Sequence, residues 1–301
     1  MTRVATIPLQ RTLSGAIQRS QAALATTQQQ LATGKKAPDL ASLGTEAVRT
    51  LSARSLVAQQ SAHADVAKRL GTTLSLYDAH ISSIETAGSD LVQALKTTLG
   101  TDQGAGLQDS IQAAFNAFRS ALNATEAGVP MFSGSQATAP FTPETLDDLV
   151  GLDPAQAFSN DDVRASARVG AGLDVGFGIT ASELGSGLLT AFRTLAEAGS
   201  IGDRPTAEQI DAIKAAIGQI GSGLDTVRGL SAGNGRKQAQ METLATRAEQ
   251  RNLLLQDIIS RNEDADLGQV AIDLATQKTT LEASYSVFGQ LSGLSLVNYL
   301  R

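Results

Sequence analysis

The chain has 301 residues, a net charge of −6 and no cysteine, so disulfides, thiolate metal sites and cysteine nucleophiles are excluded. Aromatic residues make up only 4% and tryptophan is absent, which argues against a single large core anchored by rings. The acidic balance, without a dense basic patch, argues against nucleic-acid binding. No apolar run approaches the roughly 20 residues that span a bilayer, so no membrane insertion is expected.

The N-terminal region predicts a long amphipathic helix. One stripe of this helix carries Leu13, Ile17, Leu24 and Leu31, with Ser20 and Thr27 at the intervening positions. This is the 3-4 spacing of a coiled-coil seam. Glycine and proline within residues 33–39 then end the helix.

A longer helix is expected to reach about Leu99, followed by a turn over residues 100–106 and another helix. The longer helix has a stripe at 3-4 spacing, formed by Val66, Leu70, Thr73, Tyr77, His80, Ile84, Ala87 and Leu91. The next helix is marked by Ile111, Phe115, Phe118 and Leu122. Both patterns are typical of helices that bury one face.

The middle of the chain has a different pattern. Residues 128–162 are rich in Gly, Pro, Ser, Thr and Asp and lack a long period. Alternating apolar residues over 163–169 and 173–179 flank a Gly-Ala-Gly turn, which predicts a β-hairpin rather than a phosphate-binding loop. Thr180 and Glu183 have the spacing of a capping box that starts the next helix.

The C-terminal region predicts the most regular seam. It is formed by Leu267, Val270, Leu274, Gln277, Leu281, Ser284, Phe288 and Leu291. A preceding helix is expected to use Leu244, Ala248, Arg251, Leu255 and Ile258, with a break at residues 262–266. The fold class is therefore mainly α: long antiparallel coiled-coil helices from both termini, folded back on themselves, with a small β-hairpin region in the middle.

Sites for catalysis or metal binding are not indicated. His63 and His80 are the only histidines, and neither has a carboxylate pair at metal-ligand spacing, so both are expected on helix faces. Glu263, Asp264 and Asp266 lack the spacing of a calcium loop, and we expect them to cap a helix N-terminus. The chain is expected to be no enzyme and to need no cofactor or metal.

The terminal seams indicate assembly instead. Polar residues occupy core positions of both seams, so an isolated pair of these helices would bury little apolar area. Neighbouring copies would have to supply the remaining burial. The candidate subunit-packing residues are Leu13, Ile17, Leu24, Leu31, Leu267, Val270, Leu274, Leu281, Phe288, Leu291, Leu294 and Leu296.

Several segments, in this order, resemble the bacterial flagellin family. Residues 28–36 are similar to the family's LSTGK element, and residues 129–135 look like the YLFGGT segment of its hook–filament junction members. Residues 260–266 resemble SRIEDAD, and residues 293–300 are closer to the junction members' LSLFDYL than to the NVLSLL of filament subunits. Residues 37–44 stand where many filament subunits have an Asp-rich stretch.

The resemblance implies a division of the chain and a place in the cell. Residues 1–40 with 265–301 would form an inner terminal-helix domain, residues 41–130 with 163–264 a helical rod with the hairpin, and residues 131–162 a short variable insert. Localisation would be extracellular, in the flagellum, by type III export without a cleaved signal peptide. Implied partners are other copies of the chain, a neighbouring hook-associated protein, flagellin and an export chaperone.

The resemblance favours an adaptor that joins hook to filament. A flagellin subunit of the filament itself is the first alternative. A coiled-coil type III translocator or adhesin ranks last, because residues 128–162 contain no apolar segment for membrane or ligand contact.

Overall fold

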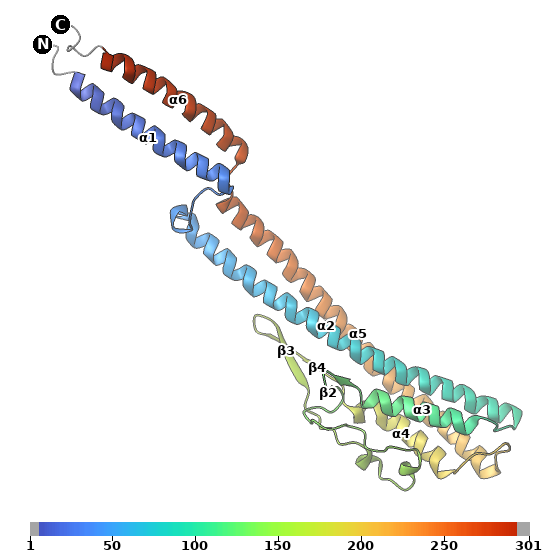
Figure 1. Ribbon diagram of the computed structural model, residues 1–301. Helices are drawn as coiled ribbons and strands as arrows, with labels where there is room; N and C mark the ends of the chain where they lie inside the picture. Colours follow the sequence, from blue (N-terminus) through green and yellow to red (C-terminus); the bar gives the residue numbers. More distant parts are fainter. Residues whose placement is uncertain (1–5, 294–301) are drawn as a thin grey trace, which may run out of the picture. The chain divides into compact units, whose positions relative to one another are not determined.

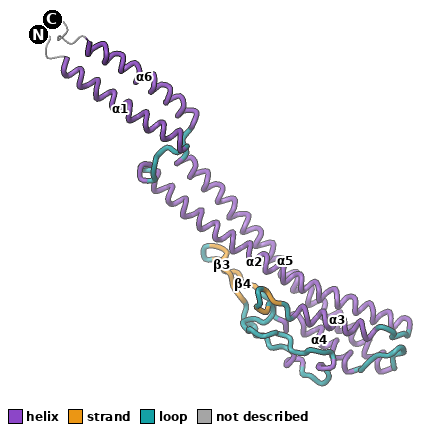
Figure 2. Tube along the Cα trace, in the orientation of Figure 1, coloured by secondary structure: helices purple, strands orange, loops and turns teal. Residues whose placement is uncertain are grey.

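The computed structural model describes residues 6–293, and their side chains from 11 to 290. The expected fold class is confirmed: the described chain is mainly α with two small antiparallel β-hairpins (Figures 1 and 2). Its α-helices are α1 Thr6–Thr33, α2 Glu46–Thr101, α3 Leu107–Leu122, α4 Ala181–Glu197, α5 Ala207–Glu263 and α6 Leu267–Gly293. The strands are β1 Thr125–Glu126, β2 Val129–Pro130, β3 Ala165–Gly170 and β4 Leu173–Phe177.

The chain divides into two compact units. The first unit combines Met1–Gln60 with Gln250–Arg301, and the second unit is Ser61–Glu249. Helices α2 and α5 each contribute residues to both units. The breaks between α1 and α2 and between α5 and α6 both lie within the first unit. The predicted domain division at residues 40 and 265 stays a prediction.

The aromatic residues are few but concentrated in the core of the second unit. Phe115 and Phe118 of α3 contact Phe192 of α4, with ring centroids 5.6 and 5.3 Å apart. Phe141 lies against both α3 rings at 6.2 and 5.3 Å. The predicted face of α3 is confirmed, because its four marker residues are fully buried. A low overall aromatic content therefore does not exclude a ring-anchored core in one part of the chain.

Helices α4 and α5 approach each other at glycines. A Cβ added to Gly187 would lie 2.9 Å from the Cα of Gly223, and one added to Gly223 would lie 3.0 Å from the backbone nitrogen of Leu188. Such distances are shorter than side chains tolerate, so only glycine permits this crossing.

The glycine crossing gives a testable difference between two positions on α5. Gly223→Ala is expected to lower the free energy of unfolding by about 1–3 kcal/mol, because overpacking outweighs the better helix propensity of alanine. Gly221→Ala is the matched control, because a Cβ there meets open space; it should stabilise the chain by up to about 1 kcal/mol. Urea denaturation measures both, and equal effects would contradict the crossing.

The predicted hairpin is confirmed as β3 and β4, which are antiparallel and joined at a turn where Gly172 has φ +72°. Val169 and Val175 pack with Leu70 and Leu74 of α2 and with Met241 of α5. This places one face of the hairpin on the helix pair. The predicted capping box is also confirmed: the Thr180 hydroxyl and the Glu183 carboxylate cap α4 reciprocally.

The irregular segment of residues 131–162 contributes to the second unit's core. Phe132, Phe141 and Leu149 are fully buried there. The segment is held by Asp161, whose carboxylate accepts hydrogen bonds from the backbone N–H groups of Ser135 (2.8 Å) and Val163 (3.1 Å). The Ser135 hydroxyl also donates to it. These bonds, those of Ser135 above all, lower the pKa of Asp161 to about 2.

The Asp161 carboxylate predicts a contribution to stability that depends on pH. Its pKa is lower in the folded chain than in the unfolded one, so the contribution is present above about pH 4 and is lost as the pH falls through about 2. Asp161→Asn is therefore expected to lower the thermal midpoint at pH 7 and to flatten its fall between pH 4 and pH 2. An unchanged slope in the variant would contradict this role.

The seam of α5 differs from the predicted one. Towards its C-terminus the buried or half-buried positions are Met241, Leu244, Ala245, Ala248, Asn252, Leu255, Ile259, Asn262 and Glu263. The predicted Leu244, Ala248 and Leu255 are among them. The expected Arg251 and Ile258 are exposed, so the prediction was wrong by one residue at these turns. Ala245, Ala248, Asn252 and Asn262 are buried or half-buried here, while Leu253, Leu254 and Ile258 are exposed, which a pattern based on hydrophobicity alone does not predict.

The stripe expected on α2 is only half right. Leu70, Tyr77, Ile84 and Leu91 are buried, as predicted. The four positions that alternate with them in the stripe, Val66, Thr73, His80 and Ala87, are only half-buried. The buried positions of the other stripe are Ala67, Leu74, Ile81 and Gly88. At every second position of the predicted stripe, the buried residue is therefore the next one along the chain.

Candidate subunit-packing surface

The two terminal helices α1 and α6 lie side by side and run in opposite directions (Figure 1). The Thr27 hydroxyl donates a 3.0 Å hydrogen bond to the side-chain oxygen of Gln277. The side-chain amide of Gln21 donates to the hydroxyl of Tyr285 at 2.5 Å. Continuing this antiparallel register along the 3-4 stripes places Leu24 opposite Leu281. The two stripes identified in the sequence therefore face each other.

The candidate subunit-packing residues have different exposures in this helix pair. Ile17 and Val270 are buried, at 8% and 7% exposure. Leu31 and Leu267 are exposed, at 42% and 50%. Half-buried positions are Leu13, Leu24, Leu274, Leu281 and Phe288. The side chain of Leu291, and Leu294 and Leu296 altogether, lie outside the described residues. A role of these residues in packing between subunits stays a prediction.

The seam between α1 and α6 buries little apolar surface. Thr27, a polar residue, is as buried as the best apolar positions, and Ser20 and Ser284 occupy another layer. Full burial of a leucine contributes about 1.5–3 kcal/mol, whereas ordering each backbone residue costs about 1–2 kcal/mol. With mostly half-buried leucines, the helix pair is marginal by itself.

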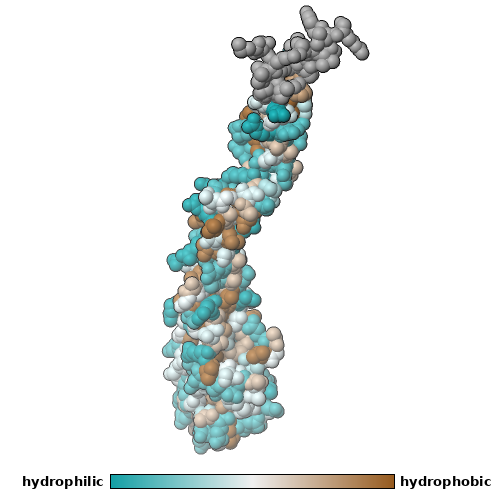
Figure 3. All heavy atoms as spheres, turned by 90° about the vertical axis from the view of Figure 1, so that its left-hand side faces the viewer, coloured by the Kyte–Doolittle hydropathy of each residue, from teal (hydrophilic) through white to brown (hydrophobic). Residues whose placement is uncertain are grey.

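Exposed apolar side chains gather in the first unit. Of sixteen large apolar side chains that are exposed among the described residues, eleven belong to this unit. They are Leu31, Val48, Leu51, Leu56, Leu253, Leu254, Ile258, Leu267, Ile272, Tyr285 and Val287. Figure 3 shows such hydrophobic side chains between hydrophilic ones on the face turned to the viewer. Large apolar patches on a protein surface commonly mark interaction sites.

Within the first unit, α2 and α5 form an apolar groove of about 690 Å³. Val48 and Leu56 of α2 and Leu255 and Ile258 of α5 line it, and Arg49 contributes the one charged group of its lining. The α2 residues of this groove and the neighbouring Leu253 and Leu254 were not predicted from the sequence. Three consecutive leucines on a helix are the signal that could have found them, because one seam cannot bury all three.

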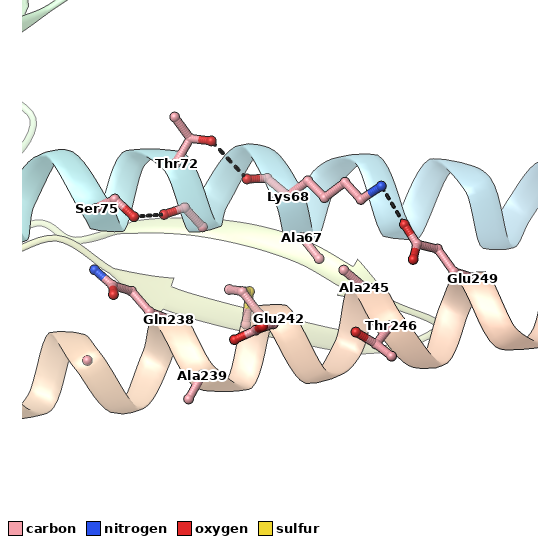
Figure 4. Close-up of a pocket in the computed structure, with 13 residues that line it drawn as sticks. Ala67, Lys68, Thr72, Ser75, Gln238, Ala239, Glu242, Ala245, Thr246 and Glu249 are labelled. Atoms are coloured by element: carbon pink, nitrogen blue, oxygen red, sulfur yellow. Dashed lines mark hydrogen bonds and ion pairs between the residues drawn. The ribbon is translucent and has the colours of Figure 1, made fainter.

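A second groove, of about 660 Å³, runs along α2 and α5 within the second unit (Figure 4). Small residues such as Gly71 and Ala245 open it, and Gln238 and Glu242 give it a polar lining. Lys68 pairs with Glu249 at one end, which raises the pKa of Lys68. No histidine lines this groove. Among residues 6–293, no group of three or more His, Asp or Glu side chains could hold a metal ion.

The acidic residues at the end of α5 have two roles. Asp266 caps α6 as expected, because its carboxylate accepts hydrogen bonds from the N–H groups of Gly268 and Gln269 at 2.9 and 3.2 Å. The expectation is wrong for Glu263 and Asp264, which form ion pairs instead. Glu263 pairs with Arg54 at 2.6 Å, and Asp264 pairs with Lys35 at 2.5 Å.

No helix in the described part of the chain combines the length and the hydrophobicity needed to cross a membrane.

No protein-family model and no curated protein sequence matches this chain. Solved structures match it in fold. A protein of Vibrio parahaemolyticus described as flagellar hook-associated superposes with a TM-score of 0.60 at 16% identity, over 72% of this chain and 97% of that one. FlgL of Bacillus cereus superposes with a TM-score of 0.55 at 15% identity, over 70% and 98%. The chain shares its fold with these proteins, as the sequence resemblance implied.

Proposed function

We propose that the chain is a structural, non-enzymatic subunit of the bacterial flagellum, an adaptor that joins hook to filament. The observation that carries this proposal is the first unit, where a thin polar seam between α1 and α6 lies among eleven exposed apolar side chains. A subunit that is completed by its neighbours has this composition. The fold shared with a hook-associated protein and with FlgL supports the flagellar setting.

In this proposal, residues 1–40 and 265–301 form the inner domain of the assembly. Copies of the chain stack head-to-tail, because heterologous contacts generate rings and helical tubes. The candidate residues Leu24 and Leu281 hold the pair together, and outward side chains such as Ile272 and Val287 contact the next copy. Neighbouring partners are a hook-associated protein on one side and flagellin on the other.

The assembly role requires export, which we propose to occur through the flagellar type III apparatus. An export chaperone would cover the apolar side chains of the first unit before assembly. The segments around Leu253 and Ile272 are the regions that most need such cover, because their side chains are 66% and 62% exposed.

Deletion of the gene tests the adaptor role. Cells without the protein are expected to build hooks without filaments and to shed flagellin into the medium, and the intact gene should restore filaments. Complete hooks that carry normal filaments would contradict the proposal. If the filaments of cells with the intact gene consist mainly of this chain, the filament-subunit alternative is favoured instead.

A further inference from the structure

The chain crosses itself at one point of the first unit, between residues 34–36 and residues 263–265. The Lys36 N–H donates to the Glu263 carbonyl at 2.7 Å, and the Ala265 N–H donates to the Gly34 carbonyl at 2.9 Å. These two backbone bonds tie the end of α1 to the connection between α5 and α6. We call residues 34–36 and 263–265 the clasp.

Charged side chains reinforce the clasp. The Lys35 ammonium lies 2.5 Å from Asp264 and 3.5 Å from Glu263, and the Lys36 ammonium donates to the carbonyl of Arg261. Glu263 is also held by Arg54 of α2 at 2.6 Å. The hydrogen bond between the two side chains, supported by their opposite charges, raises the pKa of Lys35 and lowers that of Asp264, so both groups are charged at neutral pH.

The seam between α1 and α6 does not define its own register. Apolar residues recur every seventh position on both helices, so a shift by one heptad would place Leu31 opposite Leu281 and Leu24 opposite Phe288. Thr27 would then face Ser284 in place of Gln277. The layers of Leu24 and Leu31 remain apolar and the layer of Thr27 remains polar, so packing in these layers discriminates weakly between the two registers.

The connection between α1 and α2 leaves this shift open. It spans residues 34–45, which could extend for tens of ångströms if released. A heptad shift moves one helix past the other by only about 10 Å. On the other side, α6 follows α5 after only three residues, so α6 has little freedom. The bonds between residues 34–36 and 263–265 are what hold α1 at a fixed position against α6.

We propose that the clasp is a register pin, which sets the pairing of the terminal helices that their own seam leaves ambiguous. Lys35 is the positioning residue, because its ammonium group holds the carboxylates of Glu263 and Asp264 beside the end of α1. Polar contacts can fix register where apolar layers repeat, as a single buried Asn does in coiled coils.

The test uses a chain with three introduced cysteines, Thr27→Cys, Gln277→Cys and Ser284→Cys. The natural sequence contains no cysteine, so only these three can pair. After oxidation, mass spectrometry of digested protein gives the ratio of the 27–277 to the 27–284 disulfide. The ratio reports register among paired molecules, whatever fraction of molecules is paired. With the clasp intact we expect the 27–277 disulfide to be favoured about tenfold.

Lys35→Glu is expected to lower this ratio towards one, because it places a third negative charge beside Glu263 and Asp264. Combining it with Asp264→Lys should restore the ratio. Arg193→Glu is the matched control: it makes the same charge change at an exposed pair with Glu197 in the second unit, and the ratio should not change.

Three outcomes would overturn the register pin. The first is a ratio near one with the clasp intact. The second is a high ratio that survives Lys35→Glu. In the third, the yields of both disulfides fall together in the Lys35→Glu variant while their ratio stays the same. This would mean that the clasp supports folding without selecting a register. None of these outcomes depends on partners, so the test is independent of the proposed flagellar role.

Discussion

Phe118→Ala is expected to lower the free energy of unfolding of the second unit by about 3–5 kcal/mol. Phe118 is 1% exposed, and its ring lies 5.3 Å from those of Phe141 and Phe192. Truncation removes a ring shared by α3, α4 and the irregular segment, and rigid helices cannot close the cavity. Guanidinium denaturation followed by circular dichroism measures the loss.

Leu76→Ala is the control for the ring substitution. Leu76 lies in the same unit but its side chain is exposed, so its truncation should change stability by no more than about 0.5 kcal/mol. A Phe118 variant that is as stable as the Leu76 variant would show that the aromatic cluster does not hold the second unit together.

The second large effect concerns assembly. Leu253→Glu combined with Leu254→Glu is expected to weaken the association of the chain with flagellar partners by on the order of a hundredfold or more. The two side chains are 66% and 67% exposed, so the fold of the free chain should be unchanged. Burial of two glutamates in a helix interface without partners is unfavourable. Filament growth on hooks in complemented cells measures the effect.

The assembly variant needs a control of equal chemistry. Val150→Glu adds a charge at an exposed apolar position of the second unit, and cells that carry it should grow filaments. Circular dichroism of both purified variants should match that of the natural chain. Normal filaments with the doubly substituted chain would mean that the exposed leucines of the first unit are not an interface.

The ends of the helices could be predicted because local chemistry determines them. Gly34 and Pro38 stop α1, and the capping box of Thr180 and Glu183 starts α4, as expected. The hairpin was predictable for the same reason, since alternation and glycine at a turn are local signals. These features require no knowledge of what packs against them.

Features that depend on distant residues could not be predicted. Lys35 and Asp264 are 229 positions apart, and nothing in either segment identifies the other as its partner. The seam of α5 was partly misplaced because Asn252 is half-buried and Asn262 is buried, while Leu254 and Ile258 are exposed. Phe132 and Phe141 lie in a segment without periodicity, so their burial in the aromatic core left no pattern to detect.

Hydrogen exchange of the purified free chain tests the central claim most directly. The claim is that the first unit is completed by its neighbours. Amides of α1 and α6 should therefore exchange with little protection in the monomer, while those of α3 and α4 stay strongly protected. In assembled material, α1 and α6 should become protected as well. Terminal helices that are already as protected in the monomer as the second unit's core would contradict the account.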